Sequence, residues 1–270
     1  MAVRWGMMVQ SLSRIEKAAG AGFDCVQPTA GLILNLPDEE VNRQKRRIRD
    51  QGMAFEVSPV PLPADVRVTE RGFNIYVWLE HLKKALRRLS ELGCRKLIWS
   101  DGRARLLPLE GDQTGAKEQV MQFLYMLCGA AAEWGMVVLV EPLGLRRTNF
   151  LNTLDELRDM LLHVGKENLA AAISLRELEA IGLSTAAFPS HDRLIQHVHM
   201  ENPLPSDKVR VCPRAGDGYE YRPFVRALQG IDYSGVICLP EDADLSALTY
   251  CKQIWRRGQE EGRNTPAQSK

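Results

Sequence analysis

Long hydrophobic runs are absent from this sequence. No apolar segment approaches the roughly 20 residues that a bilayer-spanning helix needs. The N-terminal segment Met1–Met8 is too short and becomes polar too soon for a signal peptide, and it is predicted to form a first strand. We therefore expect a cytoplasmic protein without a membrane partner.

A dominant charge of either sign is also missing. The 35 lysines and arginines are interspersed with 34 aspartates and glutamates, which leaves a formal net charge of +1. Proteins that bind nucleic acids concentrate basic residues on one face or along one stripe. The even distribution of charge here argues against a nucleic-acid partner.

Cysteine motifs are absent although cysteines are present. The six residues are scattered, with no C-x-x-C pair and no zinc-type spacing. Several fall in apolar segments, where a thiol behaves as a small hydrophobic group. We expect reduced, structural cysteines at positions 25, 94, 128, 212, 238 and 251.

What the sequence does contain is a regular alternation of short apolar runs and amphipathic segments. Eight runs are predicted to be strands, over residues 3–9, 22–28, 53–59, 95–101, 136–141, 168–174, 194–199 and 235–239. The segments between them have helical periodicity, for example Leu79, Leu82, Leu86 and Leu89. A closed (β/α)8 TIM barrel accommodates this alternation in about 250 residues.

An open, doubly wound α/β sheet is the alternative fold. It is disfavoured because no glycine-rich phosphate loop follows the first strand. No internal domain boundary is visible in the sequence. We predict one barrel domain over residues 1–257 and a disordered tail over 258–270.

The fifth predicted strand is a continuous apolar run that ends on the carboxylate of Glu141. Such a run is typical of a parallel strand covered on both faces. In α/β barrels, ligands bind at the carboxyl ends of the strands. The other polar or charged side chains at these ends are Gln27, Ser58, Asp101, Ser174, His197, His199 and Glu241. An isolated Glu141 beside Pro142 could equally be a solvated loop residue, so its surroundings have to decide.

The two histidines of the seventh strand are two residues apart, so the side chains of His197 and His199 share one face. Glu201 would share it too if the strand continued. A lone histidine is more often a core or surface residue than a ligand. Two on one face, beside a carboxylate, make a site role about as favourable as a structural one.

Three segments resemble one known family. They are Ala131–Leu143 with Thr148, Asn149, Asn152 and Thr153, then Ile195–Asn202, and then Arg214–Tyr219 with Asp232–Gly235. Together they are similar to the xylose-isomerase-like TIM barrels, a family of sugar and sugar-phosphate isomerases and epimerases. Its members include tagatose 3-epimerase-type enzymes, inosose dehydratases and, more distantly, endonuclease IV.

The resemblance implies a divalent metal ion, Mn, Mg or Co, held by a Glu, an Asp, a His and a second Glu at four strand ends. Glu141 matches the first ligand and His199 the third. Ser174 stands at the position of the family aspartate, and Pro240 at that of the second glutamate, with Glu241 adjacent. Glu201 is a candidate replacement ligand.

Other family positions differ as well. Glu177 falls where a family histidine is expected, and Arg147 where a substrate-binding glutamate is expected. Pro205 stands at the position of an arginine that follows the metal-binding histidine in many epimerases.

Two functions follow. The first is a sugar or sugar-phosphate isomerase or epimerase that transfers a proton next to a carbonyl through an enediolate, with help from the metal ion. Glu141 and Glu241 would be its catalytic residues. Its substrate-binding residues would be His197, Arg147, Asp101, Gln27 and Glu177.

The second is a metal-free barrel that binds a small polyol or an anionic ligand, with Arg146 and Arg147 near its anion. Both arginines could also be solvated loop charges. A nuclease is disfavoured because five histidines are too few for the three-metal cluster of endonuclease IV. A small sugar or polyol is the expected partner in both cases, and a homo-oligomer remains open.

Overall fold

The computed structural model describes residues 2–29, 31–205 and 209–264, with side chains up to residue 260. It contains nine parallel strands: β1 Arg4–Val9, β2 Cys25–Pro28, β3 Ala54–Phe55, β4 Val57–Pro59, β5 Lys96–Trp99, β6 Val137–Val140, β7 Leu169–Ser174, β8 Ile195–His199 and β9 Val236–Leu239. Their order in the sheet is β3-β2-β1-β9-β8-β7-β6-β5-β4.

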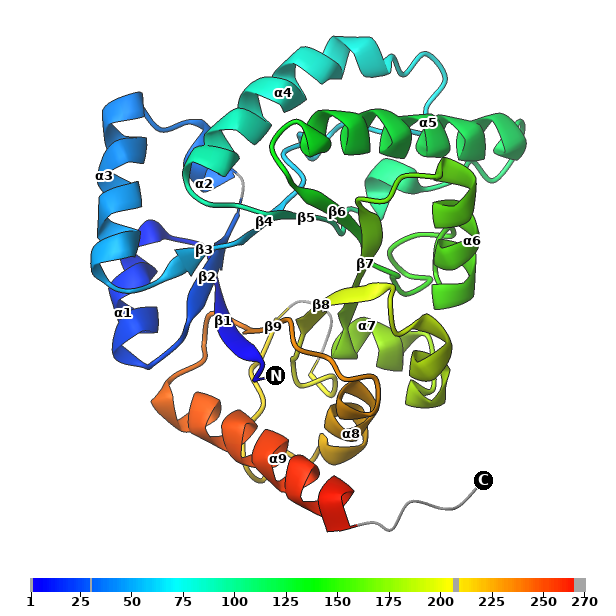
Figure 1. Cartoon of the computed structure of the whole chain (residues 1–270). Coiled ribbons are helices and arrows are strands. Elements are labelled where there is room, and N and C mark those ends of the chain that lie inside the picture. The colour runs from blue at the N-terminus through cyan, green and yellow to red at the C-terminus, as the bar shows by residue number, and fades with distance from the viewer. Residues whose placement is uncertain (1, 30, 206–208, 265–270) are drawn as a thin grey trace.

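The two ends of this order meet, because β3 and β4 are consecutive in the chain and β2 also contacts β4. The third predicted strand, over 53–59, is therefore split at Glu56, whose carbonyl accepts from the backbone N–H groups of both Arg95 and Lys96. Figure 1 shows the strands as a closed ring with the helices outside it. The predicted TIM barrel is confirmed.

The helices of this outer layer are α1 Ile15–Gly20, α2 Gly31–Leu34, α3 Asp38–Asp50, α4 Ile75–Glu91, α5 Gln113–Ala132, α6 Leu154–Val164, α7 Leu175–Ala180, α8 Arg222–Gly230 and α9 Leu245–Asn264. Short 3-10 turns occur at Leu12–Arg14, Arg103–Arg105 and Thr185–His191. No helix among the described residues is both long and apolar enough to cross a bilayer.

Strand β6 shows why the strands of this barrel have apolar sequences. Val138 and Val140 belong to the large core between strands and helices, whereas Leu139 belongs to a separate cluster inside the barrel. Both faces of the strand are buried, so every position favours a β-branched or aliphatic side chain. The strand therefore delivers Glu141 to the carboxyl end of the barrel.

The end of the chain differs from the sequence-based prediction. Helix α9 continues to Asn264, past the predicted domain end at residue 257. Gln259, Glu260, Glu261 and Arg263 are good helix formers, so the two glycines at positions 258 and 262 do not stop the helix. The rest of the predicted tail, residues 265–270, lies outside the described part of the chain.

Candidate functional site

Glu141 and His199 form a buried pair at the carboxyl end of the barrel. Glu141 follows β6 directly, and His199 is the last residue of β8. Atom Oε1 of Glu141 lies 2.9 Å from Nδ1 of His199. Burial raises the pKa of Glu141, but the hydrogen bond and charge of His199 outweigh burial and hold this pKa below its usual value. The geometry thus favours an ionised carboxylate that orients the imidazole.

Gln27 completes the support of the imidazole from the other side. It lies in β2, and its Oε1 is 3.1 Å from Nε2 of His199. In this arrangement both ring nitrogens face acceptors. With the Gln27 amide turned over, its NH2 group would donate to a neutral ring instead. In both cases the ring orientation is fixed by β2 and β6.

Arg105 lies behind this pair and is completely buried. Its Nη2 donates to the backbone carbonyl of Glu141, and its guanidinium stands 5.6 Å from the centre of the Trp99 ring. Burial lowers the pKa of Arg105 to about 10, while the nearby Glu141 carboxylate acts in the opposite direction. Arg105 therefore keeps a positive charge beneath the site without entering it.

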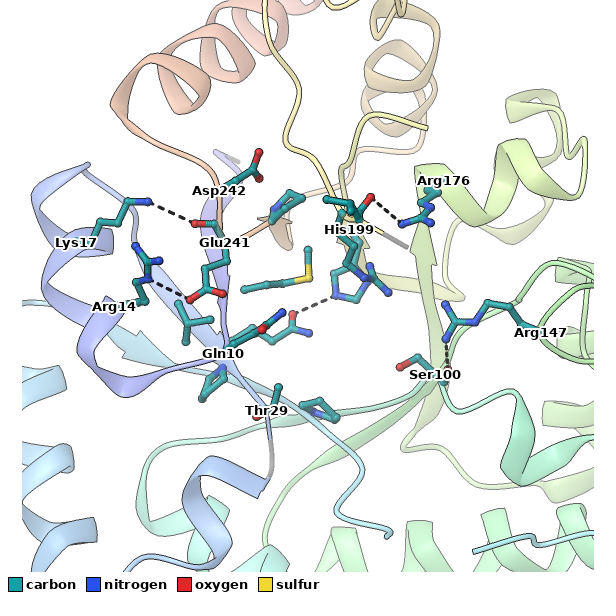
Figure 2. A pocket seen from close by; sticks show the side chains of 18 residues that line it. Gln10, Arg14, Lys17, Thr29, Ser100, Arg147, Arg176, His199, Glu241 and Asp242 are labelled. Carbon is teal, nitrogen blue, oxygen red and sulfur yellow. Dashed lines mark hydrogen bonds and ion pairs between the residues drawn. The ribbon is translucent and has the colours of Figure 1, made fainter. Parts of the chain in front are cut away.

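A cavity of about 630 Å³ opens above His199 and Gln27, and we call it the mouth cavity. Its basic lining residues are Arg14, Lys17, Arg147, Arg176 and Arg210, and its acidic ones are Glu241 and Asp242. Figure 2 shows Arg147 and Arg176 on the side opposite Arg14 and Lys17, with His199 between them. The lining is thus predominantly basic.

Two of these arginines are held by Glu201. Nη1 of Arg210 donates to Oε1 of Glu201, and Nη1 of Arg176 lies 3.9 Å from its Oε2. Burial lowers the pKa of Arg210, but Glu201 and neighbouring carboxylates outweigh burial and raise it. Strand β8 ends at His199, so Glu201 does not continue its face. Instead it binds the guanidiniums, and Ser174 Oγ donates to its Oε1 at 3.2 Å.

Arg147 is held in a similar way by Glu177. Nη1 of Arg147 is 3.0 Å from Oε1 of Glu177, and its Nη2 donates to the carbonyl of Ser100 at 3.3 Å. The second carboxylate oxygen of Glu177 accepts from the backbone N–H of Gly144 at 2.8 Å. A side chain at position 144 would crowd this contact, since its Cβ would lie 3.3 Å from Ala180 and 3.5 Å from Glu177.

The remaining sequence-predicted residues lie in three different places. Asp101 does not line the mouth cavity; its Oδ1 accepts from the N–H groups of Arg103 and Ala104 and shapes the turn after β5. Glu241 lines the cavity at the rim, 3.2 Å from Nε of Arg14. His197 lies deeper in the barrel, outside the cavity lining, with its ring centre 4.9 Å from that of His199.

The environment of His197 differs from that of His199. Neither ring nitrogen of His197 has a hydrogen-bond partner within the described ranges. Burial, followed by the charges of His199 and Lys96, lowers the pKa of His197 well below its usual value. His197 is therefore a neutral imidazole buried below the Glu141–His199 pair.

Sequence reasoning missed four basic residues of the mouth cavity. Arg176 and Arg14 could have been found, because each follows a predicted strand end by a few residues. Lys17 lies one helical turn after Arg14 and lines the same side of the cavity. Arg210 gives no such signal, because it comes from an irregular loop eleven positions after His199.

The barrel fold agrees with the protein family whose model matches this chain. The model of the xylose isomerase-like TIM barrel family matches residues 15–260. The chain belongs to this family. The resemblance of its three sequence segments is therefore confirmed. A comparison with curated proteins found no match.

Solved structures of epimerases share the fold. An L-ribulose 3-epimerase superposes with a TM-score of 0.81 at 16% identity, covering 100% of each chain. A D-allulose 3-epimerase from Methylomonas sp. gives 0.76 at 20% identity, covering 94% of this chain and 100% of that one. The E. coli 3-keto-D-glucoside 4-epimerase gives 0.71 at 19% identity, covering 97% and 100%. At these identities the likeness shows the fold.

The metal centre expected from the family does not fit the residues present. Two buried carboxylate oxygens, Oε2 of Glu141 and Oε2 of Glu201, have no hydrogen-bond partner in the part of the chain that the structure describes. A cation could use the first, whereas the second already faces the guanidinium of Arg176 at 3.9 Å. Both nitrogens of His199 are engaged, however, and the hydroxyl of Ser174 donates to Glu201. The side chain of Pro240 has no ligating atom.

The described part of the chain offers no alternative set of ligands either. Among the described residues, no group of three or more His, Cys, Asp or Glu side chains is placed to hold a metal ion. Guanidiniums stand in the mouth cavity instead. The positive charge available to a ligand here comes from four arginines and Lys17.

Proposed function

We propose that this protein binds a small anionic sugar or polyol, carrying a phosphate or a carboxylate, at the barrel mouth without a metal ion. The observation that carries the proposal is the placement of Arg147, Arg176 and Arg210 around the cavity that His199 faces. Guanidinium groups match the geometry of phosphate and carboxylate oxygens and can bind them in a bidentate manner. The epimerase relatives support a sugar as the rest of the ligand.

The carboxylates around these arginines strengthen the proposal. Glu177 and Glu201 are buried and contact the guanidiniums from behind, so they fix their positions without lining the mouth cavity. A binding site whose charged groups are fixed in advance loses little side-chain entropy when the ligand arrives. The lining therefore favours an anion over a neutral sugar.

A second candidate function is proton transfer next to a carbonyl, as in an isomerase or epimerase. It is favoured by the Glu141–His199 pair, because His199 lines the cavity and Glu141 orients it from behind. An imidazole held by a buried carboxylate is a common general acid or base. The nearby guanidiniums would stabilise the enediolate charge. In this scheme His199 moves the proton and Glu141 is a positioning residue.

Isothermal titration calorimetry in the presence of EDTA tests the binding proposal. We expect glucose 6-phosphate or gluconate to bind at least tenfold more tightly than glucose. Arg147→Ala should remove most of this difference, because Arg147 lines the mouth cavity. The neighbouring Arg146→Ala is the matched control and should not, because Arg146 does not line that cavity. Equal affinity for glucose and its phosphate would overturn the proposal.

Two further measurements separate the alternatives. Thermal unfolding with millimolar Mn²⁺ or Co²⁺ should show no increase in Tm. A clear increase, together with metal-dependent sugar binding, would favour the metal-assisted isomerase instead. Exchange of the proton next to the carbonyl of fructose 6-phosphate in D₂O, followed by NMR, tests catalysis. Exchange that is lost in His199→Gln would support the proton-transfer function.

A further inference from the structure

A second cavity of about 1000 Å³ lies beside the mouth cavity. Its walls come from the loop after β6, from helix α7 and from the loop after β8. We call it the side chamber and define it by its lining residues Leu145, Arg146, Glu179, Leu204 and Tyr219. The chamber is larger than the mouth cavity and is not explained by a site for a single sugar.

The two cavities share a wall of two arginines. Arg147 and Arg176 line both the mouth cavity and the side chamber. Each guanidinium faces a buried carboxylate: Arg147 is hydrogen-bonded to Glu177 at 3.0 Å, and Arg176 forms a longer ion pair of 3.9 Å with Glu201. A ligand that extends from one cavity into the other therefore passes these two positive charges. An anionic linkage at this junction would match them.

The side chamber itself combines an apolar surface with charged groups. Leu145 is 77% exposed and Leu204 is 59% exposed, and both line the chamber beside Tyr219. The hydroxyl of Tyr219 donates to Glu179, which fixes the aromatic ring in place. Exposed aliphatic side chains next to a fixed aromatic ring are suited to the flat face of a ligand ring. Arg146 and Glu179 add polar groups for the edge of that ring.

We propose that the two cavities form one bipartite site for a nucleoside diphosphate sugar. The sugar occupies the mouth cavity next to His199, the diphosphate lies at Arg147 and Arg176, and the nucleoside occupies the side chamber. This inference rests on the proposed function, since it assigns the anion of that ligand to a linkage between two rings. The mouth cavity has room for the sugar, the two arginines at the junction match the diphosphate, and the apolar surface of the chamber suits the base.

Calorimetry with glucose and four phosphorylated probes on the full-length protein tests the inference. Glucose 1-phosphate reaches the mouth and the junction, UMP reaches the junction and the chamber, and UDP-glucose and ADP-glucose span all three. We expect at least one of the two nucleotide sugars to bind tenfold or more tightly than glucose 1-phosphate, and UMP to compete with it. If both nucleotide sugars bind no more tightly than glucose 1-phosphate, the bipartite site is wrong and the proposed function stands. If glucose 1-phosphate and glucose bind equally, the proposed function itself fails.

Variants of the chamber make the test specific. Leu204→Ser and Tyr219→Ala should each weaken the nucleotide sugar by about tenfold, because each removes part of the surface on which the base stacks, and leave glucose 1-phosphate unchanged. Leu109→Ser is the matched control, because Leu109 is 90% exposed and lies outside both cavities. Tm values of all variants confirm that they fold. An equal loss for both ligands, or no loss in either chamber variant, would overturn the inference.

Discussion

The two histidines of β8 lie two residues apart on one strand face, yet their surroundings are opposite. His199 is bonded at both nitrogens, to Glu141 and to Gln27, and it lines the mouth cavity. His197 is fully buried below it, between Ala172 and Val236 of the adjacent strands, and its ring nitrogens have no partner among residues that the structure describes.

The difference shows how this barrel distributes polarity. At the mouth, charged groups are buried together and satisfy one another, so removing one leaves another unpaired. Deeper inside, the cross-strand neighbours of His197 are small or apolar, and a polar group there gains little from them. The mouth should therefore be sensitive to loss of charge, and the interior to changes of volume. The following predictions test this contrast.

The largest effect is expected from Glu141→Ala. The substitution removes the carboxylate that faces both His199 and the buried guanidinium of Arg105, and leaving a buried charge without its counter-charge costs about 3–5 kcal/mol. Urea unfolding at pH 7, followed by tryptophan fluorescence, measures the free energy of unfolding. Glu141→Gln keeps the volume and can still bond to Nδ1, so it should lose less and remain measurable if the alanine variant does not fold. A loss below about 1 kcal/mol for alanine would contradict the contrast.

The next largest effect is expected inside the barrel, from Gly6→Ala. A Cβ at this position would lie 2.5 Å from Sγ of Cys238 and 2.9 Å from Sγ of Cys25. Overpacking of this kind costs about 1–3 kcal/mol. Because the clash is with one sulfur above all, Cys238→Ala should recover part of the loss in the double variant. Strictly additive effects of the two substitutions in urea unfolding would show that the interior is not close-packed at Gly6.

The sequence predicted most of the fold because the barrel depends on patterns that a single chain displays. Apolar runs such as Val137–Val140 are buried on both faces, and amphipathic segments such as Ile75–Glu91 bury one face. The split of the third strand at Glu56 could not be predicted. It depends on the backbone donors of Arg95 and Lys96, which lie at the start of β5.

The site was predictable only in part for a related reason. The position of Glu141 at a strand end follows from the length of its apolar run. Its bond to His199 depends on strands β6 and β8 ending at the same height. The role of Glu201 as the partner of Arg176 and Arg210 depends on loop geometry, which no periodic pattern encodes.

A pH-dependent effect should separate the two histidines further. Because the folded-state pKa of His197 is lowered, the unfolded chain binds a proton there that the folded chain does not. The contribution of a neutral His197 is therefore fully present above the unfolded pKa of about 6.5. It is lost as pH falls below that value, with a slope of up to about 1.4 kcal/mol per pH unit.

His197→Leu tests the predicted direction of this pH dependence, because it replaces an imidazole whose ring nitrogens have no partner among the described residues with an apolar side chain that cannot titrate. At pH 7 its free energy of unfolding should be within about 1 kcal/mol of the wild type or higher. Between pH 6.5 and pH 5 the variant should lose less stability than the wild type in urea titrations. Parallel curves for the two proteins over this range would show that His197 is not kept neutral by burial.

The smallest effect on stability is expected from Glu241→Gln at the rim. Its ion pair with Arg14 is largely solvated, with 46% of the Arg14 side chain exposed, so its loss should cost less than about 1 kcal/mol.

The Glu241→Gln variant should have a clearer effect on ligand binding. Glu241 faces the same cavity as the guanidiniums, and a unit charge roughly 8 Å away in water changes affinity by about twofold. Neutralising it should therefore tighten the binding of glucose 6-phosphate. If Glu241 instead acts as a catalytic residue, as the family resemblance suggests, binding would hold while proton exchange at the carbonyl-adjacent position falls at least a hundredfold. That result would place acid–base chemistry on both sides of the mouth. The contrast between His199 and His197 would then explain the stability of the protein but not its catalysis.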